Sequence, residues 1–307
     1  MTALARILAA TDFSAPARHA VDRAFRLAAE TGASLELSHV VGQGPLDGLR
    51  RLLGLDAARV EEYILSRARE NLYALVQELG QAHGLVAGIH LTTGTVLRTL
   101  LEHADALDAD LLVVGAKGEG YLGRLLLGTT AERLLRRTTR PVLMVRQIPH
   151  EAYRRVLVPV DFSPWSAPAI RLARAVAPGA ELVVLHAFEA PFESKLKFAS
   201  VAEEAIERYR MASRQAAQAE LDRLVVEAGL DSGRVSARVI HGPTSRVILA
   251  QEQEQDCDLI VMGKHGQGVM EDLLLGSVTK HVLAEAAGDV LLVCDHQETG
   301  ENGAAHG

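Results

Sequence analysis

Two glycine-rich segments of this 307-residue sequence have the residue types and spacing of a phosphate-binding loop. In each, a Gly-x2-Gly run is followed, nine residues later, by a glycine and a hydroxyl residue, over residues 115–129 and again over 263–277. Glycines let the backbone turn sharply and bring its amides close to an anion. A helix starting at Thr129 or Ser277 would add free amides and a favourable dipole. Either hydroxyl alone would indicate a helix cap, but the repeated spacing favours phosphate binding.

The sequence is an internal duplication, because five separate blocks match each other at an offset of 147–149 residues. Residues 7–14 match 156–163, for example, and residues 110–115 match 258–263. Two domains of about 150 residues each are expected for a chain of this length. We predict a first domain over residues 1–148, a second over residues 149–296, and a disordered tail over residues 297–307.

Each half alternates short apolar runs with longer amphipathic stretches, which predicts alternating strands and helices. In the first half we expect strands near residues 4–10, 34–40, 86–91, 110–114 and 141–145, and helices near 16–31, 56–83, 95–107 and 129–138. Strict alternation predicts two tandem α/β domains, each built on a doubly wound parallel sheet. Ligands of such sheets bind beyond the carboxyl ends of the strands, where the strand order reverses. Residues 42–60 and 189–200 are expected to be variable connections.

The motif Gly-x2-Gly-x9-Gly-[Ser/Thr] resembles the nucleotide motif of the ATP-binding universal stress proteins, and the resemblance covers residues 4–146 and 154–294. It implies an adenine nucleotide α-hydrolase-like fold in each half. It also implies that the end of the first strand, a residue after the second strand and the glycine loop contact the nucleotide. The contacts expected in the first half are Thr11, Asp12, Val40, Val114, Gly115, Gly118, Gly128, Thr129 and Thr130. Those expected in the second half are Val160, Asp161, Ala187, Met262, Gly263, His265, Gly266, Gly276, Ser277 and Val278.

The resemblance implies ATP, ADP or AMP as the ligand, with or without Mg²⁺. The expected function is a stress-response protein in which nucleotide occupancy acts as a switch or sensor, with little or no catalysis. The fifth strands of the two domains are expected to pair with each other, and a homodimer is left open. One alternative is a slow metal-dependent ATPase or autophosphorylating enzyme that uses Asp12 and Asp161. A second alternative is a nucleotide-free scaffold for protein or small-molecule partners.

Composition narrows the remaining function classes. The net charge of −7 argues against a nucleic-acid partner. No apolar run approaches the roughly 18 residues of a membrane span, and residues 1–10 are typical of a first strand rather than a secretory signal. Cys257 and Cys294 form no metal-binding or redox spacing, so we expect two buried thiols in a reducing compartment. These features predict a cytoplasmic protein with no membrane partner.

Four weaker signals complete the predictions. His39 and His186 occupy matching positions and are expected to be structural rather than metal ligands. Lys117, Lys264 and His265 lie inside the loops, where phosphate contact and a solvated loop tip are equally compatible with the sequence. The GxGxxG pattern over 118–123 follows a fourth strand instead of a first and is taken as coincidental.

The fourth signal is charge. Residues 133, 136, 137 and 140 are arginines on one predicted helix face, which is either a solvated face or a surface for an acidic partner. Gly123-Arg124 in the first half stands where the second half has Glu271-Asp272. That difference predicts tighter polyphosphate binding in the first half.

Overall fold

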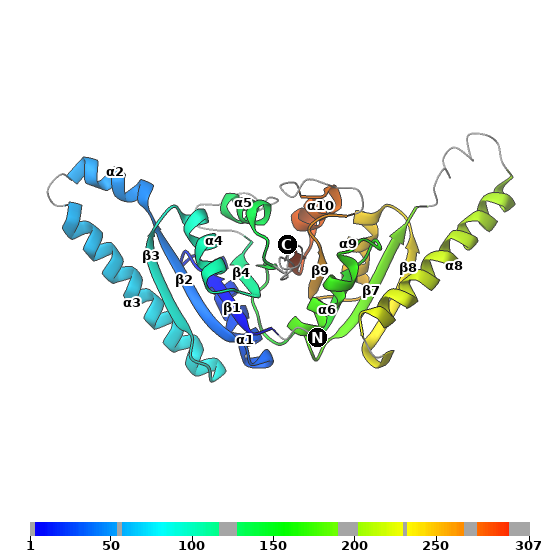
Figure 1. Cartoon of the computed structure of the whole chain (residues 1–307), viewed down its shortest axis with the longest axis horizontal. Helices are drawn as coiled ribbons and strands as arrows, with labels where there is room; N and C mark the ends of the chain where they lie inside the picture. Colours follow the sequence, from blue (N-terminus) through cyan, green and yellow to red (C-terminus); the bar gives the residue numbers. More distant parts are fainter. Residues whose placement is uncertain are drawn as a thin grey trace, which may run out of the picture.

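A single ten-stranded sheet runs through the molecule, in the order β3-β2-β1-β4-β5-β10-β9-β6-β7-β8 (Figure 1). The computed structural model describes residues 4–53, 57–116, 128–189, 202–229, 232–266 and 275–294. The strands of the first half are β1 (Arg6–Ala10), β2 (Ser34–Gly42), β3 (Gly88–Gly94), β4 (Leu111–Gly115) and β5 (Val142–Val145). Those of the second half are β6 (Arg155–Pro159), β7 (Glu181–Phe188), β8 (Val235–His241), β9 (Leu259–Gly263) and β10 (Asp289–Val293). Neighbours within each half are parallel, which confirms two tandem doubly wound α/β domains.

Helices cover both faces of this sheet (Figure 1). Those of the first half are α1 (Ala15–Thr31), α2 (Gln43–Leu53), α3 (Ala57–His83), α4 (Val96–Ala106) and α5 (Thr129–Arg137). Those of the second half are α6 (Ser166–Val176), α8 (Glu203–Glu227), α9 (Thr244–Glu254) and α10 (Ser277–Glu285), with a short 3-10 helix at Ser232–Arg234. Ser14 caps α1 and Pro16 lies in its first turn.

The central strands β4, β5, β9 and β10 are buried on both faces, which is why their sequences read as continuous apolar runs. The edge strands β3 and β8 are only partly buried. Along β1, Ile7 and Ala9 join one core cluster while Leu8 joins the other. The first cluster packs under α1, α3, α6 and α8, and the second under α4, α5, α9 and α10. The two halves therefore share two continuous apolar layers.

Helix α2 lies within the variable connection expected over residues 42–60, where the sequence predicts no helix before residue 56. Gly44 and Gly48 weaken the intrinsic helix propensity of this segment. Leu46 is nevertheless buried and α2 packs on α3, so tertiary contacts outweigh local propensity here. The corresponding connection of the second half, residues 190–201, lies outside the described residues.

The two domains meet where β5 and β10 pair in antiparallel fashion, and a buried carboxylate fixes this junction. Asp289, at the start of β10, accepts the backbone amides of Arg146 at 2.7 Å and Gln147 at 3.1 Å, and the Tyr153 hydroxyl at 2.6 Å. Arg23 of α1 places its Nε 3.4 Å from Asp289 Oδ2 and its guanidinium 4.0 Å over the Tyr153 ring. Burial, together with the neighbouring Asp289 charge, raises the pKa of Tyr153 well above its usual range, so this phenol stays a donor.

Both cysteines are buried thiols that form no disulfide, as predicted. Burial raises the pKa of Cys257 to about 12, so this thiol remains protonated at neutral pH. A protonated, enclosed thiol is a poor nucleophile. Among the described residues, no helix is long and apolar enough to cross a membrane.

Replacing Asp289 by Asn tests the junction. The variant keeps the shape of the side chain but leaves the Arg23 guanidinium buried without its counter-charge, so we expect a loss of about 3–5 kcal/mol in the free energy of unfolding, measured in urea. The double variant Arg23→Met/Asp289→Asn should lose less than the sum of the two single variants. Strict additivity would contradict a coupled ion pair.

The buried thiols predict slow labelling of the native protein. With an aromatic disulfide reagent at pH 8, we expect negligible reaction of Cys257 over minutes, because little thiolate is present and access is blocked. In guanidinium chloride both cysteines should react at once. Rapid labelling of Cys257 in the native state would show that the site opens.

Candidate functional site

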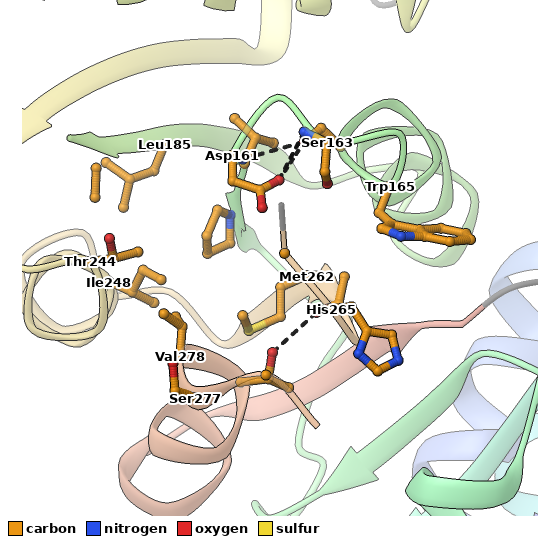
Figure 2. A pocket seen from close by; sticks show the side chains of 18 residues that line it. Asp161, Ser163, Trp165, Leu185, Thr244, Ile248, Met262, His265, Ser277 and Val278 are labelled. Atoms are coloured by element: carbon orange, nitrogen blue, oxygen red, sulfur yellow. Dashed lines mark hydrogen bonds between the residues drawn. The ribbon is translucent and has the colours of Figure 1, made fainter. Parts of the chain in front are cut away.

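A pocket opens in the second domain where the strand order reverses between β6 and β9. Its volume is about 300 Å³, at the lower end of the range for small-molecule pockets. Ends of β6, β7 and β9 meet the first turns of α9 and α10 there (Figure 2). Every residue that the sequence predicts as a contact in this half lines the pocket: Val160, Asp161, Ala187, Met262, Gly263, His265, Gly266, Gly276, Ser277 and Val278.

The carboxylate of Asp161 is held by a strained turn. Phe162 has a φ of 61°, in the left-handed region that a bulky side chain rarely adopts. The turn lets Asp161 Oδ1 accept the Ser163 amide at 3.0 Å and the Ser166 hydroxyl at 3.2 Å. In Figure 2 this carboxylate lies across the pocket from Ser277. One oxygen of Asp161 thus stabilises the turn, and the turn sets the position of the carboxylate in the pocket.

The two matching histidines support this turn. His186 Nδ1 lies 2.9 Å from the Val160 carbonyl oxygen, and its ring lies 4.2 Å from that of Phe162. His39 repeats both contacts in the first half, with Thr11 at 2.7 Å and Phe13 at 4.4 Å. The prediction that these histidines are structural is confirmed by these contacts.

The glycines of the second loop differ in what requires them. A Cβ on Gly263 would lie 3.0 Å from the His265 carbonyl oxygen and 3.1 Å from Cβ of Trp165, and one on Gly266 would lie 2.8 Å from Asp161 Oδ2, so a side chain at either position would crowd its neighbours. A Cβ on Gly276 would meet only ordinary contacts at 3.5 Å or more, and its φ of −56° suits any residue. Gly276 is the N-cap of α10, a position where Ser, Thr, Asn or Asp would stabilise the helix. Neither packing nor backbone conformation explains this glycine, whereas an anion at the helix start would.

The pocket has an apolar side and a polar end. Val160, Leu185, Ala187, Ile248 and Met262 supply apolar side chains. The first turn of α10 also lines the pocket, and its unbonded amides and dipole favour an anion. This combination suits a flat apolar group attached to a charged one.

Lys264 does not join the pocket. It is buried, and its Nζ donates to the Arg136 carbonyl oxygen at the end of α5, across the domain junction, at 3.3 Å. His265 does line the pocket. The sequence leaves phosphate contact open for both Lys264 and His265, and only His265 lies where it could reach a phosphate.

In the first domain, the corresponding residues also surround the end of β1 and β4. Thr11 and Val114 are buried, Asp12 and Val40 are half-buried, and Thr130 is exposed. A Cβ on Gly115 would lie 2.9 Å from backbone atoms of Pro16, so α1 approaches this loop as closely as Trp165 approaches Gly263. Asp12 Oδ1 accepts the amide two residues on, as Asp161 does.

The rest of the first loop cannot be compared. Gly118 and Lys117 lie outside the described residues, and so do the GxGxxG pattern and both sides of the Gly123-Arg124 and Glu271-Asp272 comparison. Gly128 is the N-cap of α5, as Gly276 is of α10, while the side chain of Thr129 is not described.

Several lining residues were not anticipated. Thr244 and Ile248 come from α9, whose start follows Gly242-Pro243, and that pair matches Gly94-Thr95 in the duplication. The repeated glycine before a helix was the available signal. Thr279 was also missed: its hydroxyl donates to the carbonyl oxygens of Gly263 and Lys264, both at 3.3 Å, and ties the loop to α10.

The sequence predicts four arginines on one helix face, and for Arg140 this prediction is wrong. Helix α5 ends at Arg137, and Arg140 is buried beyond it. Its side chain bonds Asp105 Oδ1 at 3.2 Å, Asp108 Oδ1 at 2.8 Å and the Ala109 carbonyl oxygen at 2.9 Å. The guanidinium holds the connection between α4 and β4, since Arg140 lies in the segment between the end of α5 and the start of β5.

Comparison with known proteins places these features in a family. The Universal stress protein family matches residues 4–146 and 152–293. A universal stress protein of Mycolicibacterium smegmatis is 30% identical over 298 residues, 94% of this chain and 96% of that protein. One of Mycobacterium tuberculosis is 30% identical over 239 residues, 72% of this chain and 74% of that protein. A solved universal stress protein structure from Archaeoglobus fulgidus has a TM-score of 0.67 at 21% identity, covers 94% of this chain and 98% of its own, and shares the fold. The chain thus belongs to the universal stress protein family, with two of its domains in tandem.

Proposed function

We propose that this protein binds an adenine nucleotide, ATP, ADP or AMP, in the second-domain pocket and another at the matching site of the first domain. The observation that carries the proposal is the pairing, in one pocket, of an apolar wall with a glycine-flanked helix start. An aromatic base suits the first and phosphates suit the second. No catalytic step is needed for this function.

The pocket also suggests how the nucleotide would lie. The base would rest against Val160, Ala187 and Met262, with the phosphates at the first turn of α10. Asp161 lies across from α10 (Figure 2), so its carboxylate would accept a ribose hydroxyl and avoid the phosphate charge. As Asp161 is the one carboxylate among the described lining residues, a Mg²⁺ ion would be held by the phosphates and water.

The same proposal includes a switch and a pairing of domains. Nucleotide occupancy would select one of two conformations by binding one of them more tightly. The β5–β10 contact would persist in solution and would cover two sheet edges that otherwise invite pairing with another chain. A homodimer would then use other surfaces, and light scattering with and without ATP would detect it.

Nucleotide stoichiometry tests the proposal. Isothermal titration of nucleotide-free protein should give two ATP sites per chain, and Gly276→Val should remove one of them. A Cβ at this position is tolerated by its protein neighbours, so the branched side chain should obstruct the phosphates without unfolding the domain. Mass spectrometry of nucleotide released from fresh protein would identify the natural ligand.

A matched control is available at Gly179, where an added Cβ would meet nothing within 4 Å and φ is not in the left-handed region. Gly179→Val should retain both sites. Silent titrations with ATP, ADP and AMP on protein proven empty would refute nucleotide binding and favour a scaffold.

The enzymatic alternative has its own signature. Linear, metal-dependent ADP production that Asp12→Ala and Asp161→Ala both reduce would favour a slow ATPase over a switch. We expect instead that Asp161→Ala weakens nucleotide binding in the second domain and that ADP production stays at the background rate.

A further inference from the structure

A cluster of three potential metal ligands lies in the first domain, apart from the nucleotide site. It combines Glu36 of β2, His90 of β3 and His103 of α4, and one ligand atom from each lies within 4.8 Å of the others. Strand register explains the meeting: Glu36 pairs with Gly88 and Ser38 with His90, so Glu36 and His90 share a sheet face. Helix α4 covers that face (Figure 1). His103 of α4 contacts Glu36 there.

The side chains are already in contact. His103 Nε2 lies 2.7 Å from Glu36 Oε1, and the rings of His90 and His103 stack with centroids 3.6 Å apart and an angle of 11°. All three are half-buried, which leaves a path for an ion and water.

The fold does not require these residues. The duplication places Val183, Arg238 and Gln251 at the corresponding positions of the second half. There, Arg238 Nη1 donates to Gln251 Oε1 at 3.5 Å, and this set cannot hold a cation. The first half therefore carries metal-binding side chains at positions where the same architecture is built without them.

We propose that Glu36, His90 and His103 bind a divalent transition-metal ion, with zinc as the representative ion and water as the fourth ligand. Two imidazoles and a carboxylate with an open position form an established zinc ligand set, whereas Mg²⁺ and Ca²⁺ prefer oxygen ligands. Tetrahedral zinc needs donor atoms about 3.3 Å apart at its usual bond lengths. The Glu36–His103 contact would open slightly, and the stacked rings would tilt so that their lone pairs converge. The ion would tie β2, β3 and α4 together. This inference is independent of nucleotide binding.

Zinc titration of tag-free, chelator-treated full-length protein, without nucleotide, tests the site. We expect one tight site per chain in calorimetry, and Co²⁺ should give the visible absorption bands of a tetrahedral complex. His103→Gln should weaken zinc binding by at least about tenfold. The glutamine amide can still donate to Glu36, so the metal-free fold should survive, as a thermal melt in EDTA would check. Glu36→Gln provides a second variant with the same expected loss.

His83→Gln is the matched control. His83 Nε2 lies 2.7 Å from Asp22 Oδ1, so the same histidine–carboxylate contact is altered, but among the described residues this pair belongs to no group of three ligands. This variant should bind zinc as the wild type does. The proposal is overturned if the wild type shows no tight site, if His103→Gln and Glu36→Gln bind as tightly as the wild type, or if His83→Gln loses as much affinity as they do.

Discussion

The buried carboxylate of Asp289 is the interaction on which the arrangement of the two domains depends. It gathers two amides of the interdomain connection, one phenol and one guanidinium from α1, so elements from both halves meet on a single side chain. Hydrophobic contact alone would allow two sheets to slide along their shared edge, because it has no direction. Hydrogen bonds to one fixed acceptor do have direction, and they set the register in which Leu143 faces Leu291. A charge buried in this way is costly unless every partner is present, which makes the junction specific.

The order of strands and helices and the residues of the second-domain pocket could both be predicted from the sequence, because both depend on short-range sequence patterns. Apolar runs mark strands buried on both faces, and the end of each strand fixes where the next loop residues go. Asp161, Met262 and Gly276 are far apart in the chain, yet the reversal of strand order at β6 and β9 brings them to one place.

The features that sequence reasoning missed depend on contacts between distant side chains. Arg140 looked like a helix-face arginine, but Asp105 and Asp108 hold it in the interior. Helix α2 has poor propensity and forms over a buried Leu46. The role of Asp289 could not be seen because its counterpart in the first half is Pro141, so the duplication offered no repeated signal. Comparison of the halves detects what they share and overlooks what each acquired alone.

Lys264 links the two halves mechanically, because this residue of the second domain is hydrogen-bonded to a helix of the first. Lys264 lies inside the second glycine loop, and its ammonium group donates a hydrogen bond to the last turn of α5. The first residue of α5 follows Gly128 of the first glycine loop. Helix α5 is only 9 residues long, and a helix this short moves as a rigid unit. A displacement of the loop at Lys264 must therefore break the Lys264–Arg136 hydrogen bond or move helix α5. If the hydrogen bond holds, motion of the second loop is transmitted through α5 to the first loop. The coupling free energy between the two loops is then the same in both directions.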